Sequence, residues 1–191
     1  MKKMKPKDIL VPTLALFLIC LVATVLLALT NNVTAKTIAW NEIDKANAAR
    51  SEVLDTTRFS EEAVEPHTGL RYCEGLYENG ETMGYIVTSA AKGYGGDVKV
   101  MVGFDLDGTI VGFTILDCSN ETPGLGQSSK TPEFMSRFIG KSGTLEVNKN
   151  SNDGQNIQAI TAATITSKAV VRAVNEATLA YLYLNGGADN D

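Results

Sequence analysis

The segment from Leu70 to Ala90 reads Leu-Arg-Tyr-Cys-Glu-Gly-Leu-Tyr, then Glu-Asn-Gly-Glu, then Thr-Met-Gly-Tyr-Ile-Val-Thr-Ser-Ala. Two strand-like runs therefore flank Asn79-Gly80, and this dipeptide favours a tight hairpin turn because both residue types tolerate positive φ. Val98 to Phe104 and Thr109 to Leu116 flank Asp105-Leu106-Asp107-Gly108 in the same way. The sequence thus predicts two antiparallel hairpins.

Three segments have apolar residues at helical spacing. The first runs from Trp40 to Leu54, and the second from Pro132 to Ile139, where Thr131 is the expected N-cap. The third runs from Ser167 to Leu184, has a broad apolar face, and ends at Asn185-Gly186-Gly187. Hairpins with helices at their ends predict an α+β domain.

The run from Ile9 to Leu29 is apolar, carries no charge, and is long enough to cross a bilayer as a helix. Lys2, Lys3, Lys5 and Lys7 precede it, so the positive-inside rule places the N-terminus in the cytoplasm and the remainder outside the cell. A signal peptide cleaved near Val33-Thr34-Ala35 is the alternative, but the run is longer than the usual signal core. We expect a single-pass cell-membrane protein in the lipid bilayer. Its parts are a basic tail, a transmembrane helix, a helical linker with the domain entry, an extracytoplasmic domain and a short tail, with bounds 1–8, 9–29, 30–69, 70–187 and 188–191.

Charge and cysteine content narrow the function classes. The formal net charge is −5, and because the first eight residues carry +3, the rest carries −8, which argues against nucleic acid as a partner. Cys73 and Cys118 could pair in an oxidising compartment, but we expect two buried free thiols. No metal-ligand spacing is present, and His67 is expected in a loop.

The stretch Gln158-Ala-Ile-Thr-Ala-Ala-Thr164-Ile-Thr-Ser-Lys168 gathers hydroxyls and alanines just before the last predicted helix. A phosphate near Thr164 would meet unpaired backbone N–H groups and the positive end of the helix dipole. An ordinary threonine-rich turn with a helix cap is the alternative.

The order of these residues resembles the Ser/Thr-Gly-Ala-Thr signature of the FMN-binding domain family, in which a separate flavin transferase esterifies the last threonine to the phosphate of FMN. The resemblance implies that Thr164 carries FMN covalently and that Thr161 and Thr166 are phosphate or backbone partners, with Ala162 and Ala163 inside the motif. Two residues depart from the family pattern, Ala162 in place of Gly and Gln158 in place of Asp. The methyl group of Ala162 would cost about 1 kcal/mol or more if φ there must be positive.

The loop Glu121-Thr-Pro-Gly-Leu-Gly126 follows the second hairpin. Its glycines allow the backbone to approach a ligand, and Leu125 offers an apolar face to a ring. A Pro-Gly turn from a strand into a helix is the alternative. The loop looks like one in the G subunits of Rnf complexes and in the C subunits of sodium-pumping quinone reductases, where it lies against the isoalloxazine ring, and Gly93-Tyr-Gly-Gly96 is also similar. The resemblance implies that the cofactor-binding residues here are Glu121, Thr122, Gly124, Leu125 and Gly126.

These resemblances imply an electron-transfer flavoprotein subunit of a membrane-bound ion-translocating ferredoxin:NAD+ oxidoreductase, whose partners are the other membrane subunits and a flavin transferase. The assembly would move Na+ or H+, the flavin would perform the redox chemistry, and no catalytic residue of the chain itself is expected. The alternatives are the quinone reductase subunit, a stand-alone extracytoplasmic flavin carrier, and an assembly protein whose flavin site has decayed.

One motif indicates a different activity. Asp105-Leu-Asp-Gly-Thr109 after an apolar strand matches the pattern of haloacid-dehalogenase-type phosphatases. That site needs a parallel sheet with Mg²⁺ and further carboxylates, and no βαβ alternation follows. A hairpin turn is therefore the favoured interpretation.

Overall fold

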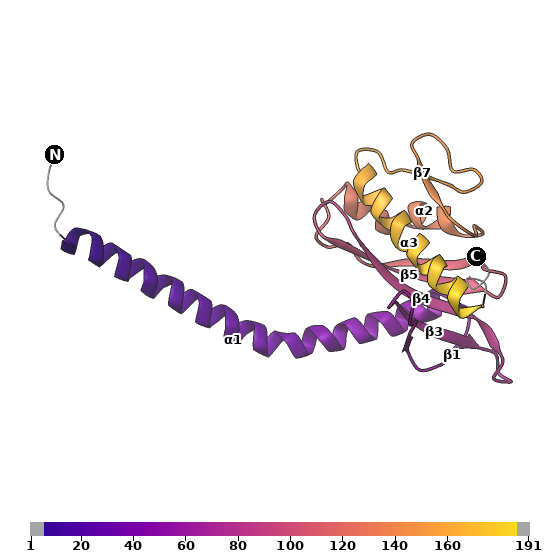
Figure 1. Ribbon diagram of the computed structural model, residues 1–191, viewed down its shortest axis with the longest axis horizontal. Helices are drawn as coiled ribbons and strands as arrows, with labels where there is room; N and C mark the ends of the chain where they lie inside the picture. The colour runs from indigo at the N-terminus through magenta and orange to yellow at the C-terminus, as the bar shows by residue number, and fades with distance from the viewer. Residues whose placement is uncertain (1–5, 187–191) are drawn as a thin grey trace. The chain divides into compact units, whose positions relative to one another are not determined.

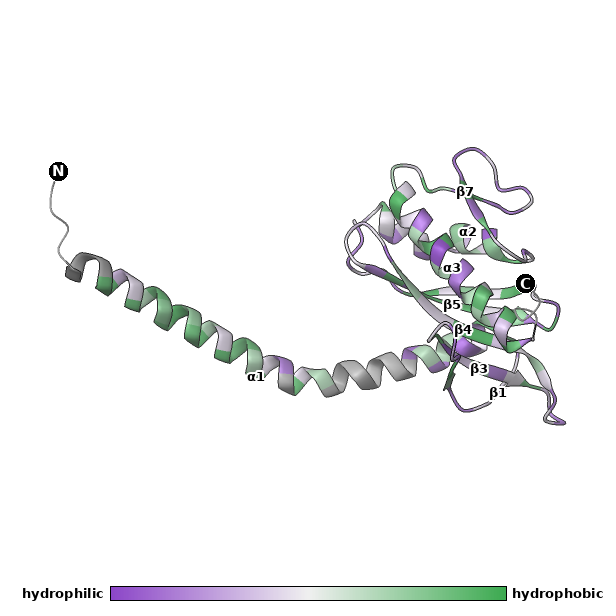
Figure 2. Ribbon diagram, in the orientation of Figure 1, coloured by the Kyte–Doolittle hydropathy of each residue, from purple (hydrophilic) through white to green (hydrophobic). Residues whose placement is uncertain are grey.

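The computed structural model describes residues 6–186. It separates into two compact units that divide between Asp44 and Lys45, and helix α1 (Pro6–Val53) provides the first unit and the start of the second. The segment Leu10–Ala35 of α1 has a mean hydropathy of 2.8 and is long and apolar enough to cross a membrane. Figure 2 colours most of this segment green, as hydrophobic. The predicted N-terminal apolar helix is therefore confirmed, while residues 1–5 of the expected basic tail and residues 187–191 lie outside the described residues.

The second unit is built on an antiparallel sheet (Figure 1). The strand order is β1-β3-β4-β5-β6, and β2 also pairs with β3. Both predicted hairpins are confirmed, because β3 pairs with β4 and β5 pairs with β6. Residues 58–59 and 63–64, inside the segment expected as a helical linker, are short strands on the edge of this sheet. The strands are β1 (Arg58–Phe59), β2 (Ala63–Val64), β3 (Arg71–Leu76), β4 (Thr82–Lys92), β5 (Asp97–Asp105) and β6 (Ile110–Asp117).

Helix α3 (Thr164–Leu184) begins three residues before the predicted start, so Thr164 is its first residue. Helix α2 (Pro132–Met135) is shorter than predicted and continues as the 3-10 turn η2 (Ser136–Phe138), after an earlier turn η1 (Gly126–Lys130). Thr131 occupies the N-cap position of α2, as predicted, although its hydroxyl makes no capping bond and donates instead to the carbonyl of Ser128 at 2.8 Å. A parallel pair, β7 (Glu146–Asn148) and β8 (Asn156–Gln158), was not predicted.

The main core lies between one face of the sheet and α3, which crosses that face in Figure 1. Val100, Val102 and Phe104 of β5 are fully buried there. Ala173 and Ala177 of α3 are also fully buried, because small side chains allow the helix to approach the strands closely. This packing fixes the N-terminal end of α3 relative to the sheet.

The last turns of α1 cover the opposite face of the sheet, where Ala49, Val53 and Leu54 are buried with Cys73, Ile86 and Met101. The helix lies directly on strand backbone. A Cβ atom on Gly103 would be 2.3 Å from the Val53 carbonyl oxygen, and one on Gly112 would be 1.9 Å from it. The end of α1 is therefore part of the folded domain. Cys73 belongs to this cluster and Cys118 to the main core, and both are buried free thiols.

The turn between β5 and β6 uses Asp105 as a structural residue. Its carboxylate oxygen Oδ1 accepts hydrogen bonds from the N–H groups of Asp107 at 3.0 Å and Thr109 at 2.8 Å. Gly108 has a φ of 81°, as such a turn requires. The phosphatase interpretation is not supported, because the carboxylate expected to act as a nucleophile builds a hairpin turn of an antiparallel pair.

The loop between β2 and β3 is organised by the buried carboxylate of Glu65, which is 1% exposed. Burial raises the pKa of Glu65, but hydrogen bonds from the Thr68 hydroxyl, the N–H groups of His67 and Thr68, and the His67 ring together outweigh it and lower the pKa from 4.5 to about 2. The His67 ring also stacks on Tyr183 of α3, with ring centroids 4.4 Å apart. His67 is thus a loop residue, as predicted, and the structure adds a packing role.

Candidate functional site

The N-terminus of α3 presents free hydrogen-bond donors beside Thr164. Ala163 occupies the N-cap position and its side chain makes no capping bond. Within residues 6–186, no acceptor pairs with the backbone N–H groups of Thr164, Ile165 or Thr166, and the first bonded amide is that of Ser167. Thr164 itself is partly exposed. A hydroxyl and three free N–H groups at the positive end of a helix dipole are suited to hold a phosphate.

The turn that leads into α3 contains a strained residue. Ala162 has a φ of 61°, and among residues 6–186 it is the only residue other than glycine with positive φ. The first turn of α3 holds this conformation, because the Ser167 hydroxyl accepts the Ile160 N–H and donates to the Ala163 carbonyl, each at 3.0 Å. Ala162 thus adopts a backbone that favours the glycine expected at this motif position.

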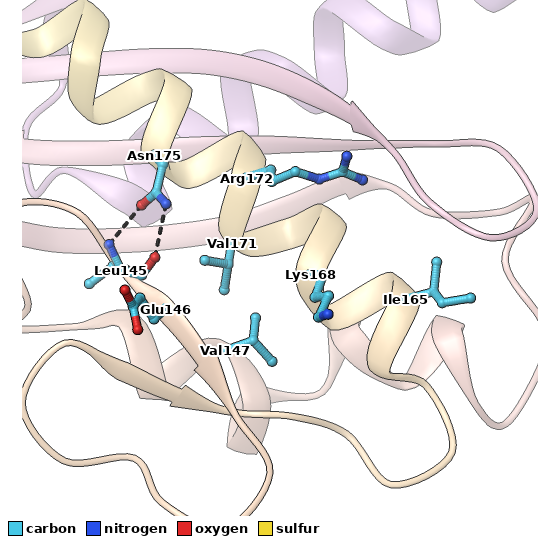
Figure 3. Close-up of a pocket in the computed structure, with 8 residues that line it drawn as sticks. All are labelled: Leu145, Glu146, Val147, Ile165, Lys168, Val171, Arg172 and Asn175. Atoms are coloured by element: carbon cyan, nitrogen blue, oxygen red, sulfur yellow. Dashed lines mark hydrogen bonds between the residues drawn. The ribbon is translucent and has the colours of Figure 1, made fainter.

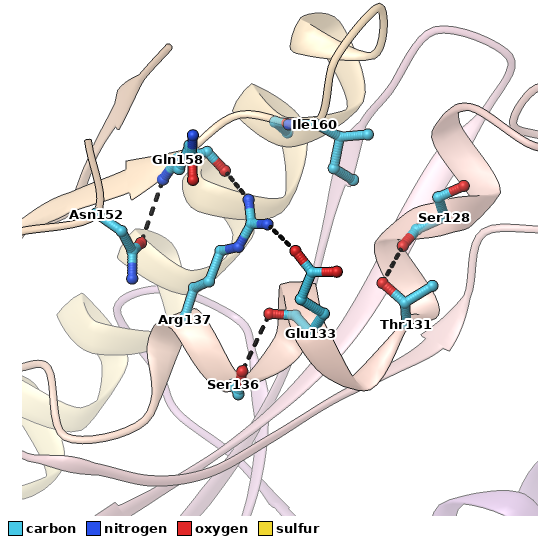
Figure 4. Close-up of polar contacts among 9 residues, drawn as sticks. Ser128, Thr131, Glu133, Ser136, Arg137, Asn152, Gln158 and Ile160 are labelled. Atoms are coloured by element: carbon cyan, nitrogen blue, oxygen red, sulfur yellow. Dashed lines mark hydrogen bonds and ion pairs between the residues drawn. The ribbon is translucent and has the colours of Figure 1, made fainter. Parts of the chain in front are cut away.

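The other end of this turn is fixed by α2 and η2 (Figure 4). The Arg137 guanidinium donates to the carbonyl of Gln158 at 2.7 Å and pairs with Glu133 at 2.8 Å. The Gln158 N–H donates to the side chain of Asn152 at 3.2 Å. The backbone around residues 158–163 is therefore held from both sides, and it delivers Thr164 in a defined position.

Glu121 joins three motif segments that are distant in the sequence. Glu121 is 2% exposed. Oxygen Oε1 accepts the N–H of Gly95 at 2.9 Å, and Oε2 accepts the hydroxyl hydrogen of Thr166. Gly126 lies against the same carboxylate, since a Cβ there would be 2.6 Å from Oε2. The glycine turn 93–96, the loop 121–126 and the start of α3 thus meet at this carboxylate.

The residues predicted to bind the cofactor divide into two groups. Glu121, Gly126, Ala163 and Thr166 are buried. The others lie at the surface or partly exposed, namely Thr122, Gly124, Leu125, Thr161, Ala162 and Thr164. Leu125 is 40% exposed and immediately precedes η1, while Gly124 has a φ of 74° and open space around it. The tip of the loop is therefore available to a ligand.

A groove between α3 and β7, which sequence reasoning missed, has a volume of about 540 Å³ (Figure 3). Its wall is rigid, because the Asn175 side chain makes two hydrogen bonds of 2.9 Å with the backbone of Leu145. Arg172 donates to the Lys92 carbonyl at 2.7 Å and so ties α3 to the end of β4. The sequence signal that could have revealed this groove was the spacing of Lys168 and Arg172, which follow Thr164 at intervals of four residues along the helix. The groove is lined by Leu145, Glu146, Val147, Ile165, Lys168, Val171, Arg172 and Asn175.

These features fit a phosphorylated ligand with an apolar ring. The phosphate would be held by the free N–H groups at the start of α3, and the exposed side chain of Leu125 would provide apolar area for a ring. No group of three or more histidine, cysteine or acidic side chains suited to a metal ion occurs among the described residues.

Comparisons with known proteins identify two regions of the chain. Residues 93–178 match the FMN-binding domain family, and residues 1–53 match the RnfG N-terminal region. The fold is similar to the crystal structure of Shewanella oneidensis NqrC, with a TM-score of 0.52 and 18% identity over 73% of this chain and 74% of that one. At this identity the likeness shows a shared fold alone.

Sequence relatives are more similar. The chain is 41% identical over 190 residues to the G subunit of the Na(+)-translocating ferredoxin:NAD(+) oxidoreductase complex of Acetobacterium woodii, covering 90% of this chain and 91% of that protein. It is 32% identical over 170 residues to the G subunit of the proton-translocating ferredoxin:NAD(+) oxidoreductase complex of Clostridium ljungdahlii, covering 88% and 89%. The chain therefore belongs to the family of G subunits of ion-translocating ferredoxin:NAD(+) oxidoreductase complexes and contains an FMN-binding domain.

Proposed function

We propose that this protein is the electron-transfer flavoprotein subunit of a membrane-bound ion-translocating ferredoxin:NAD+ oxidoreductase, the Rnf complex, and that it carries FMN as a phosphoester on Thr164. The proposal rests on the position of Thr164 as the first residue of α3 beside three unpaired backbone N–H groups. Thr164 is also the acceptor position of the resembled signature.

The chain's own residues hold and orient the cofactor. The N–H groups of Thr164, Ile165 and Thr166 stabilise the negative charge of the phosphate, and the ester bond keeps the flavin from diffusing away. Thr122, Gly124 and Leu125 at the tip of the loop offer contact area to the ring, and Thr161 lies exposed just before the attachment point. When bound, FMN supplies the one- and two-electron chemistry, and no catalytic residue of the chain is needed.

The protein acts at the membrane in this proposal. The segment Leu10–Ala35 anchors it, and the lysines at positions 2, 3, 5 and 7 keep the N-terminus in the cytoplasm and the flavin domain outside. Its partners are the other membrane subunits of the complex, to and from which it passes electrons, and a flavin transferase during maturation. Protease added to intact cells should digest the domain and leave a short membrane-bound fragment. A freely soluble protein that begins near Lys36 would contradict the anchor.

In-gel fluorescence tests the covalent flavin. The full chain is expressed with and without a flavin transferase, purified in detergent, denatured and separated on a gel. A fluorescent band at the mass of the chain is expected only in the presence of the transferase. A non-fluorescent band in both samples would contradict covalent attachment, whereas flavin that leaves the chain on denaturation would indicate non-covalent binding.

A further inference from the structure

We propose that Glu121 is a positioning residue that locks the loop 121–126 to the start of α3, and that it does not contact the cofactor itself. The inference rests on the proposed function for the identity of the cofactor. The lock itself is a property of the polypeptide. It assigns Glu121 and Thr166 a role different from the cofactor contact that the sequence motifs suggested.

Both carboxylate oxygens of Glu121 already have hydrogen-bond partners within the protein. Its two carboxylate oxygens accept hydrogen bonds from Gly95 and Thr166, which lie 26 and 45 residues away in the sequence. Thr166 is 2% exposed, and its hydroxyl hydrogen is used in this bond. Neither side chain therefore has a free polar atom directed to solvent.

The carboxylate has no cationic partner among the described ion pairs. A buried carboxylate is costly unless hydrogen bonds replace its hydration, so the N–H of Gly95 and the hydroxyl of Thr166 must both be in place. Loss of either partner leaves a buried acceptor unpaired. The three segments are therefore held in one mutual arrangement.

Glycine packing around the carboxylate makes the arrangement specific. A Cβ on Gly93 would be 2.3 Å from Oε1, and one on Gly126 would be 2.6 Å from Oε2. The backbone of Glu121 is also fixed, because the Gln127 side chain donates to its carbonyl at 3.0 Å. The tight enclosure leaves the carboxylate no alternative position.

The lock sets the positions of Thr164 and Leu125, the two residues that face the cofactor in this proposal. Thr166 lies two residues after Thr164 in the first turn of α3, and Gly126 directly follows Leu125. The Glu121 carboxylate contacts the Thr166 hydroxyl and lies against Gly126, so it fixes the separation between the attachment point and the exposed tip of the loop. Precise placement of this kind depends on supporting hydrogen bonds behind the contact residues.

Matched variants separate the lock from a general loss of stability. Glu121→Ala removes both hydrogen bonds, whereas Glu121→Gln retains the size and can still accept from Gly95 while donating to Thr166. Thr166→Val removes one bond at nearly constant volume, and Thr166→Ser restores it. Glu65→Ala is the control, because Glu65 is also a buried, hydrogen-bonded carboxylate but belongs to the loop between β2 and β3.

The first measurement is hydrogen exchange of the full chain expressed without flavin transferase. Thr166→Val should accelerate exchange about tenfold at the amides of Gly95 and Ser167, the first hydrogen-bonded amide of α3, as expected for one lost buried hydrogen bond. Glu121→Ala removes both bonds and should accelerate exchange there at least as much. Glu65→Ala should leave these peptides unchanged. Wild-type exchange at both places in Thr166→Val would overturn the inference.

The second measurement is the flavin absorption spectrum and midpoint potential of the same proteins after flavinylation. Both should shift in Glu121→Ala and Thr166→Val and return to wild-type values in Glu121→Gln and Thr166→Ser. An equal shift in Glu65→Ala, or none in Glu121→Ala, would overturn the inference. The wild type could also stay without flavin after expression with the transferase, while the variants still show the expected exchange pattern. This result would contradict the proposed function and support the lock.

Discussion

Replacing Ala162 with glycine should stabilise the protein, although such a change usually destabilises. Ala162 has a φ of 61° and an exposed side chain, so no packing is lost. A left-handed backbone costs a residue with a Cβ about 1–2 kcal/mol, and glycine removes this cost. Glycine also stabilises the unfolded chain by about 0.4–1 kcal/mol through greater conformational entropy, which offsets part of the gain. The free energy of unfolding should therefore rise by roughly 0.5–1 kcal/mol. At about 2–4 °C per kcal/mol for a chain of this size, the melting temperature should rise by roughly 1–4 °C.

The neighbouring residue supplies the control. Ala163 has a φ of −128° and is 5% exposed. Ala163→Gly therefore removes a buried methyl group and increases the conformational freedom of the unfolded chain, without relieving any backbone strain. It should lower the free energy of unfolding by about 1–2 kcal/mol. Both variants are compared with the wild type by thermal unfolding of the full chain in detergent. A melting temperature lowered equally by both substitutions would refute the positive φ at Ala162.

Three other changes test the packing, the pH dependence and the ring contact. Gly112→Ala places a Cβ 1.9 Å from the Val53 carbonyl oxygen and should lower the free energy of unfolding by about 3 kcal/mol in a urea titration, against about 1 kcal/mol for Gly140→Ala, which has open space. A similar loss for both would exclude the close contact. The pKa of Glu65 is lowered from 4.5 to about 2, so its contribution to stability is present above pH 4.5 and lost as pH falls toward 2. Glu65→Gln should flatten the melting temperature across that range, and an unchanged slope would argue against the shift. Leu125→Ala should alter the flavin spectrum and potential without preventing attachment, and an unchanged spectrum and potential would count against a ring contact.

Local signals made much of the fold predictable. The turns at Asn79-Gly80 and Asp107-Gly108 fixed two hairpins, because their backbone requirement is met within a few residues. The pair of β7 and β8 could not be predicted, since three-residue strands carry no measurable periodicity. The same holds for β1, whose two residues gain order only by pairing with β3.

The site was predictable as a set of motifs but not as an arrangement. Thr164 and Leu125 were identified from their neighbours in the sequence, and their roles toward FMN stay predictions. The contacts of Glu121 with Gly95 and Thr166 depend on chain folding over tens of residues, so no local pattern reveals that its carboxylate is buried. From the sequence we expected strain at Ala162 if φ there must be positive, and φ is positive in the structure.

The location of the flavin on the chain decides whether Thr164 is the attachment site. The full protein is expressed with a flavin transferase, its intact mass is measured, and the modified peptide is mapped. The wild type should carry one FMN on Thr164, and Thr164→Ala should fold normally without it, because a partly exposed substitution at a helix start changes stability little. Flavin on Thr161 or Thr166, or an unmodified wild-type chain, would contradict Thr164 as the attachment site.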